Sequence, residues 1–137
     1  MRKRTKAREY ALKILYQMEM TKDGHSESVR AFWEREPETE ESVREFAGQL
    51  VKGVTENIKD IDAKIAKYAT NWQIGRMAVI DRNILRMATF EMLYLSDIPA
   101  KVSINEAIDM AKKYGDKDSG KFVNGVLDKI NKTKAEK

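Results

Sequence analysis

The chain has 137 residues, with 26 lysines and arginines against 22 acids and no cysteine. This length suits one compact domain with its own core, and the lack of cysteine excludes disulfides, thiolate metal sites and cysteine nucleophiles. No apolar run reaches the ~20 residues of a membrane span and no secretory signal is evident, so we expect a soluble cytoplasmic protein.

The chain begins with a basic arm, residues 1–8, that contains no acid. Its cations are Arg2, Lys3, Arg4, Lys6 and Arg8. Because the rest of the chain is nearly neutral, this localised charge indicates a polyanionic partner, either a nucleic acid or an anionic membrane. Acids on the first helix disfavour the membrane. A merely solubilising terminus is the alternative, and composition alone does not decide between them.

Apolar residues three or four positions apart predict helices throughout, and the alternation typical of strands is nearly absent. A first helix is expected over residues 4–20, followed by a turn over 21–26 in which Gly24 ends the helix. A short helix around Phe32 follows and stops before Pro37, because the residue ahead of a proline disfavours the helical conformation.

The longest apolar pattern runs over residues 43–68. It exceeds the usual length of a globular helix, so we expect a break near Asp60 or Asp62, where an aspartate would cap a new helix. A link over 71–75 contains Trp72. Another helix is expected over 77–95.

The C-terminal part contains two further predicted helices. Ser103 and Glu106 match the capping-box pattern S-x-x-E, which predicts a helix start, and Gly115 suits the end of that helix. A final helix is expected to begin at Asp118 or Ser119, ahead of a polar tail over 131–137. The sequence therefore predicts an all-α fold of six or seven helices in one domain, residues 1–137, with short connections as in helix bundles.

The final helix contains the stretch KFVNGVLDKI, in which Phe122 has two interpretations. Its spacing from Val126 is typical of a core residue. Its neighbours Lys121 and Asn124 instead suggest an RNA contact, because aromatic rings near basic groups are the usual platform for unstacked bases. Gly125 is costly inside a helix, and we interpret it as a site of close backbone packing.

Catalysis has little support in the sequence. The single histidine, His25, lies in a turn without a positioned partner, and no phosphate-binding glycine loop or metal-ligand spacing is present. We therefore expect no enzyme activity and no cofactor.

Four stretches in order along the chain resemble the NusB (N-utilization substance B) family of bacterial transcription antitermination factors. They are R-x-x-A-R with A-L-x-x-L-Y at 4–16, D-R-N-I-L-R at 81–86, I-P-x-x-V-x-I-N-E-A-I at 98–108, and K-F-V-N-G-V-L-D at 121–128. The resemblance implies two three-helix bundles plus a connecting helix. It also implies binding of boxA RNA, notably of ribosomal RNA operons, with the small-subunit ribosomal protein that acts as NusE. This pair would join the RNA polymerase elongation complex.

The same resemblance assigns roles to individual residues. Arg4, Lys6 and Arg8 fall in the family's basic RNA-binding segment. A second RNA-binding set is implied at the C-terminal end: Asp118, Lys121 and Phe122. The ribosomal-protein interface is implied to include Tyr16 and Asp81.

Two other functions stay open at this point. The first is a protein–protein adaptor that makes no RNA contact, in which the basic arm is only a solubilising tail. The second is a stand-alone RNA-binding module related to the RNA-binding domains of some RNA cytosine methyltransferases.

Overall fold

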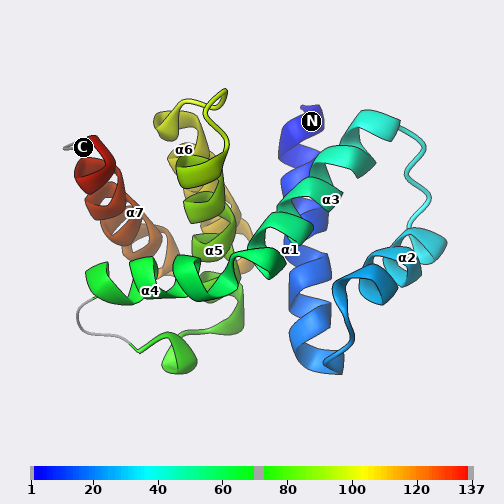
Figure 1. Ribbon diagram of the computed structural model, residues 1–137, viewed down its shortest axis with the longest axis horizontal. Coiled ribbons are helices and arrows are strands. Elements are labelled where there is room, and N and C mark those ends of the chain that lie inside the picture. The colour runs from blue at the N-terminus through cyan, green and yellow to red at the C-terminus, as the bar shows by residue number, and fades with distance from the viewer. Residues whose placement is uncertain (1, 70–72, 136–137) are drawn as a thin grey trace. The chain divides into compact units, whose positions relative to one another are not determined.

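The computed structural model describes residues 2–69 and 73–135, and every regular element in these ranges is helical (Figure 1). The elements are α1 (Lys3–Thr21), α2 (His25–Arg35), α3 (Glu41–Glu56), α4 (Ile58–Tyr68), the 3-10 helix η1 (Ile74–Arg76), α5 (Val79–Tyr94), α6 (Ala100–Tyr114) and α7 (Ser119–Ala135). These seven α-helices confirm the all-α prediction. Within the described ranges, none of them has the length and apolarity that crossing a membrane requires.

The chain divides into two compact units between Glu56 and Asn57. Unit 1 is a bundle of α1, α2 and α3, in which α1 packs mainly on α3. Fully buried alanines, Ala7 and Ala11 on α1 and Ala47 on α3, allow the two helices to approach closely.

An aromatic cluster fastens α2 to this bundle. The rings of Tyr10, Phe32 and Trp33 meet edge to face, with centroids 5.0, 5.2 and 5.6 Å apart. This geometry places the positive ring edge against a neighbouring negative face, which adds to the apolar burial.

Two helix boundaries differ from the prediction. The residue that takes the left-handed conformation after α1 is Lys22, with φ 61°, whereas Gly24 is extended and precedes α2. The long apolar pattern does break, but at Asn57 rather than near Asp60 or Asp62. Asp60 instead lies in the first turn of α4, where its charge favours the helix dipole.

Unit 2 is built around α5, which contacts α4, α6 and α7. Residues on all sides of α5 are buried, including Ile84, Leu85, Met87 and Ala88. α5 therefore forms the interior of unit 2, and its buried polar side chains, such as Arg86 and Glu91, bond to neighbouring helices. The predicted link before it is described only from Gln73 onward, so Trp72 lies outside the described residues.

The capping-box prediction at Ser103 is wrong. α6 begins at Ala100, directly after Pro99, which is the N-cap residue and has φ −59° and ψ 137°. Ser103 is buried inside α6, and its hydroxyl donates to Glu91 Oε1 on α5 at 2.8 Å. The serine therefore satisfies a buried carboxylate instead of a helix end.

The start of the last helix is as expected, since α7 begins at Ser119. It continues to Ala135, so most of the predicted polar tail is helical. Gly125 lies on an exposed part of α7, and a Cβ built there would have no atom within 4 Å beyond its own helix and neighbours. The prediction that Gly125 allows close packing of a neighbouring helix is therefore wrong.

Replacing Gly125 with alanine is expected to raise the free energy of unfolding by about 0.5–1 kcal/mol. The glycine costs conformational entropy and the added methyl meets open space. Gly115→Ala is the matched control and should destabilise, because its Cβ would lie 2.6 Å from Ser119 Cβ and 2.8 Å from the Ala111 carbonyl oxygen. Urea unfolding measures both, and a loss of stability in Gly125→Ala would contradict the open position.

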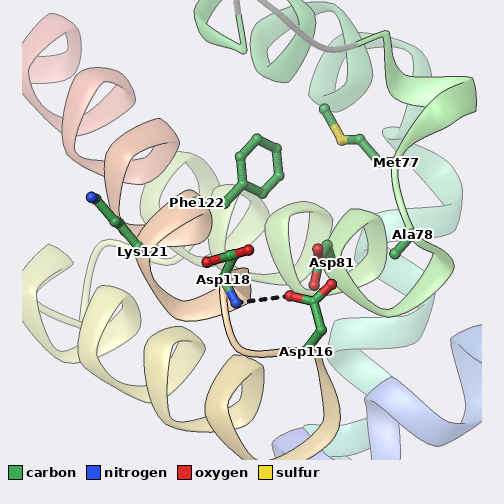
Figure 2. Close-up of a pocket in the computed structure, with 7 residues that line it drawn as sticks. All are labelled: Met77, Ala78, Asp81, Asp116, Asp118, Lys121 and Phe122. Atoms are coloured by element: carbon green, nitrogen blue, oxygen red, sulfur yellow. Dashed lines mark hydrogen bonds between the residues drawn. The ribbon is translucent and has the colours of Figure 1, made fainter.

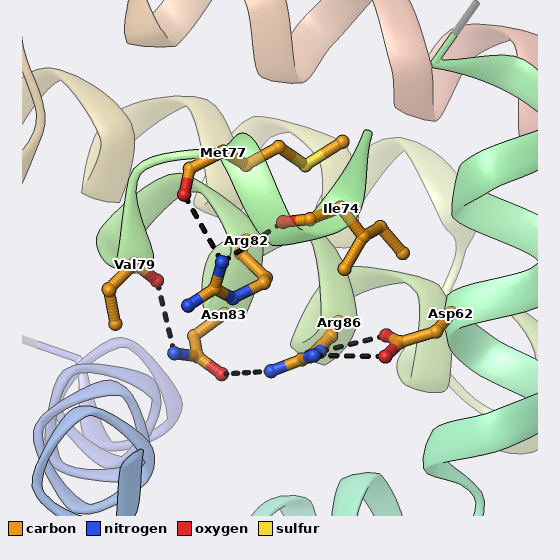
Figure 3. Close-up of polar contacts among 7 residues, drawn as sticks. All are labelled: Asp62, Ile74, Met77, Val79, Arg82, Asn83 and Arg86. Carbon is orange, nitrogen blue, oxygen red and sulfur yellow. Dashed lines mark hydrogen bonds and ion pairs between the residues drawn. The ribbon is translucent and has the colours of Figure 1, made fainter. Parts of the chain in front are cut away.

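A polar network ties α5 to α4 and η1 (Figure 3). The guanidinium of Arg86 donates from Nε and Nη2 to both carboxylate oxygens of Asp62, at 2.8 and 2.9 Å, and from Nη1 to Asn83 Oδ1. Arg82 Nη1 donates to the carbonyls of Ile74 and Met77 at 3.0 and 3.2 Å. Arg82 thus fixes the segment that leads into α5, and Arg86 ties α5 to α4.

Candidate nucleic-acid interface

A pocket of about 460 Å³ opens in unit 2, beside the start of α5 and the turn between α6 and α7 (Figure 2). Its lining residues are Met77, Ala78, Asp81, Asp116, Asp118, Lys121 and Phe122. The fold therefore brings Asp118, Lys121 and Phe122 together with Asp81, which the family resemblance assigned to the ribosomal-protein interface. Asn124 is exposed on α7 and does not line this pocket.

The side chain of Asp116 organises the turn before α7. Its Oδ1 accepts from the backbone N–H of Asp118 at 2.8 Å, and its own N–H donates to Ser119 Oγ at 3.0 Å. This reciprocal arrangement is the local kind of bond that aspartate and serine make in turns and at helix starts. It fixes Asp118 at the pocket edge.

Asp81 has an unsatisfied oxygen in this pocket. The residue is 9 % exposed, and its Oδ1 accepts no hydrogen bond from the described residues. Burial raises the pKa of Asp81, the Ser119 hydroxyl opposes that shift, and the nearby charge of Asp116 adds to it. A ligand with an N–H group would satisfy the free oxygen and lower the cost of its burial.

Phe122 and Lys121 complete the site with different chemistry. The ring of Phe122 is partly exposed and stands on the side of the pocket toward Met77, while Lys121 extends outward from the carboxylates (Figure 2). An aromatic face, carboxylate acceptors and an outer ammonium together fit a planar group bearing N–H donors and an attached anion. Among the described residues, no group of three acidic, histidine or cysteine side chains is arranged to hold a metal ion.

The basic arm in unit 1 presents less charge than its sequence suggests. Lys6 forms an ion pair with Glu38 at 2.5 Å, and Lys3 pairs with Glu40 at 3.4 Å. The Lys6 ammonium is the largest cause that lowers the pKa of Glu38 to about 2. These acids, from the segment between α2 and α3, offset part of the arm.

The arginines of the arm differ in exposure. Arg8 is only 2 % exposed and its guanidinium lies 5.4 Å from the centre of the Phe46 ring, so it has a structural position in the bundle. Arg4 is exposed, with its guanidinium 4.5 Å from the same ring, and Arg2 is exposed ahead of α1. The expectation that Arg8 meets an RNA phosphate therefore conflicts with its burial.

A second, open hollow of about 370 Å³ lies between the starts of α1 and α3. It is lined by Lys3, Arg4, Ser42, Glu45, Phe46 and Gln49. The contact between the Arg4 guanidinium and the Phe46 ring restrains the arginine side chain, which limits the entropy that binding an anion there would cost.

Tyr16, the other residue assigned to the ribosomal-protein interface, lies on α1 and is 41 % exposed. Met20, one turn later on the same helix, is 53 % exposed. This pair forms a small apolar surface on unit 1.

Sequence reasoning missed three lining residues of the unit 2 pocket: Met77, Ala78 and Asp116. The D-x-D spacing of Asp116 and Asp118 between two helices was a usable signal, since such residues favour turns. Met77 and Ala78 follow η1, and the Arg82 bonds that position this segment are not visible in a linear pattern.

Comparison with known proteins gives a consistent result. The family model described as "NusB family" matches residues 5–132, so Arg2, Lys3 and Arg4 lie outside the match. The transcription antitermination protein NusB of Thermodesulfovibrio yellowstonii is 48 % identical, over 95 % of this chain and 92 % of the relative. The transcription antitermination protein NusB of Anaeromyxobacter dehalogenans is 47 % identical, over 93 % of this chain and 89 % of the relative.

Two solved structures are similar in both fold and sequence. The NusB structure of T. maritima has a TM-score of 0.87 and 38 % identity, covering 94 % of this chain and 90 % of that one. A structure of antitermination factors NusB and NusE in complex with double-stranded RNA has a TM-score of 0.89 and 32 % identity, covering 97 % and 98 %.

Proposed function

The chain belongs to the NusB family of non-catalytic transcription antitermination proteins, and from that premise we propose that it binds unpaired RNA of the boxA type. In this proposal it acts in the cytoplasm, together with the small-subunit ribosomal protein that serves as NusE. The complex joins the elongating RNA polymerase and helps it resist termination, notably in ribosomal RNA operons. The 137 residues act as one RNA-binding domain.

The observation that carries the RNA contact is the unit 2 pocket. A base would stack on Phe122, and its N–H groups would donate to Asp118 and to the unsatisfied oxygen of Asp81. Lys121, outside the carboxylates, would meet the adjoining phosphate. Such a contact needs a base free of its stack, which favours single-stranded over double-stranded RNA.

The basic arm supplies a second contact in this proposal. Arg2 and Arg4 are its most suitable phosphate ligands, because both side chains are exposed whereas Arg8 is buried. Two weak RNA surfaces held on one chain raise the overall affinity without either being strong alone.

The ribosomal partner would bind the exposed apolar surface around Tyr16. The related structure that contains NusB, NusE and RNA supports a partner of this class. Its own RNA contacts would add to those of this chain, so we expect the two proteins to bind RNA more tightly together than apart.

Arg4→Gln tests the arm. The variant should bind single-stranded RNA several-fold more weakly, and the slope of log affinity against log salt should fall in magnitude by about 0.7, the value for one phosphate on a single strand. Lys13→Gln is the control, since Lys13 is exposed and nine residues along α1, on the opposite face. Fluorescence anisotropy across salt concentrations measures both. Equal affinities and slopes for Arg4→Gln and the control would contradict the role of the arm.

A further inference from the structure

A second group of cations surrounds Tyr68, where α4 meets α7 in unit 2. Thr133 Oγ1 on α7 donates to the Tyr68 hydroxyl oxygen at 2.6 Å, which fixes the phenol at the junction of the helices. The ammonium of Lys67 lies 5.6 Å from the centre of the Tyr68 ring. We call Lys64, Lys67, Tyr68, Lys129 and Thr133 the α4–α7 basic patch.

Positive charges from α4 act on the Tyr68 hydroxyl at the centre of this patch. The pKa of Tyr68 lies below its ordinary value, first because of the Thr133 hydrogen bond and further because of the charges on Lys67 and Lys64. Two α4 cations therefore act on the same hydroxyl. Lys129 lies four residues before Thr133, on the same face of α7.

These lysines have no acidic partners to neutralise them. In the described part of unit 2, the structure gives no ion pair to Lys64, Lys67 or Lys129. Asp62 binds Arg86, and Asp128 pairs with Lys132 at 3.1 Å. Asp60, one turn before Lys64 on α4, offsets part of the local charge without forming an ion pair with it. Cations without an ion pair beside a fixed hydroxyl favour an anionic ligand.

Gly125 connects this patch to the Phe122 pocket. Phe122, Gly125 and Lys129 are spaced three and four residues apart, so they follow one face of α7. The rise from Phe122 to Lys129 is about 10 Å. Because Gly125 is exposed and has open space around it, no side chain covers the helix backbone at this position between the pocket and the patch. A glycine with no packing role suits a site where a ligand approaches the backbone closely.

We propose that the α4–α7 basic patch binds the phosphate backbone of the RNA strand whose base occupies the Phe122 pocket, with the strand passing over Gly125. This inference rests on the proposed function and extends it. The continuity of pocket, bare helix face and patch favours RNA over an acidic protein surface as the source of the anion. Tyr68 and the three lysines would contact phosphates and sugars, which sets the path of the strand but carries no sequence information.

The test uses Lys64→Gln/Lys67→Gln in the full chain, with a single-stranded RNA of about 12 nucleotides, within the range of known single-strand sites. The double variant should bind this RNA several-fold to tenfold more weakly, and its salt slope should fall in magnitude by about 1.4, for two phosphates. The matched control is Lys101→Gln/Lys112→Gln, which removes two exposed α6 lysines and the same net charge. Gly125→Gln, which places a long side chain on the bare face, should also weaken binding.

The outcomes separate this inference from the proposed function. If Phe122→Ala weakens RNA binding while the α4 variant matches the α6 control in affinity and slope, the patch is not on the RNA path and this inference is overturned. If the wild-type chain binds no RNA under any salt condition, the proposed function itself fails. A loss of ribosomal-protein binding, with RNA binding unchanged, would identify an acidic protein surface as the ligand and likewise overturn the inference.

Discussion

Replacing Phe122 with alanine is expected to weaken the binding of single-stranded RNA by about 1–3 kcal/mol, or roughly 5- to 150-fold. The ring is partly exposed at the edge of the unit 2 pocket, beside Asp118 and Lys121, where a base can stack on it. The chain should lose less stability than the roughly 3–5 kcal/mol typical of removing a fully buried phenylalanine. Fluorescence anisotropy and urea unfolding measure the two effects.

Phe122→Trp is the matched variant, because a larger aromatic face preserves stacking. It should retain RNA affinity close to that of the wild-type chain. If Phe122→Ala instead loses roughly 3–5 kcal/mol of stability and keeps its RNA affinity, Phe122 is a core residue and the pocket is not an RNA site.

Replacing Arg86 with methionine is expected to lower the free energy of unfolding by roughly 3 kcal/mol. Arg86 is largely buried and makes two bonds to Asp62 and one to Asn83, so its removal takes both donors from the partly buried Asp62 carboxylate (Figure 3). The Asp62→Leu/Arg86→Met double variant should recover much of this loss, since neither charge then remains partly buried.

Urea unfolding of the two single variants and the double variant gives the coupling energy between Asp62 and Arg86. Lys101→Met, at an exposed position of α6, controls for the loss of a cation and should change stability little. A coupling energy near zero would contradict the role of this ion pair in holding α4 against α5.

The helices were predictable because their cause is local. The spacing of Ile84 and Ala88, or of Val123 and Val126, follows directly from 3.6 residues per turn, and burial of that stripe is what folds the helix. Helix ends were less predictable, because they depend on which residue takes an unusual backbone conformation. Lys22 adopts the left-handed conformation that the sequence suggested for Gly24.

The errors at polar residues have a different cause, since their partners lie far away in the sequence. Ser103 fits a local cap, yet it bonds to Glu91, 12 residues away on another helix. Lys6 belongs to an apparently uncompensated basic arm, yet Glu38 reaches it from 32 residues away. The spacing of neighbouring residues in the sequence does not show whether a polar side chain will bond to a nearby residue or to a distant one.

The candidate site was predictable in part. The family resemblance assigned Asp118, Lys121 and Phe122 to one RNA-binding set, and all three line the same pocket. Gly125 was assigned to packing, and the structure instead leaves it open. Its cost inside a helix was readable from the sequence, but what lies beside it depends on the surrounding fold.

In the proposed complex, an unpaired RNA base occupies the pocket beside Phe122. An NMR titration of ¹⁵N-labelled protein with single-stranded RNA tests it residue by residue. The largest shift changes are expected at the backbone amides of Ala78, Asp118 and Phe122, with smaller changes continuing through Gly125. Saturable RNA binding that leaves these amides unshifted, while others move, would contradict it.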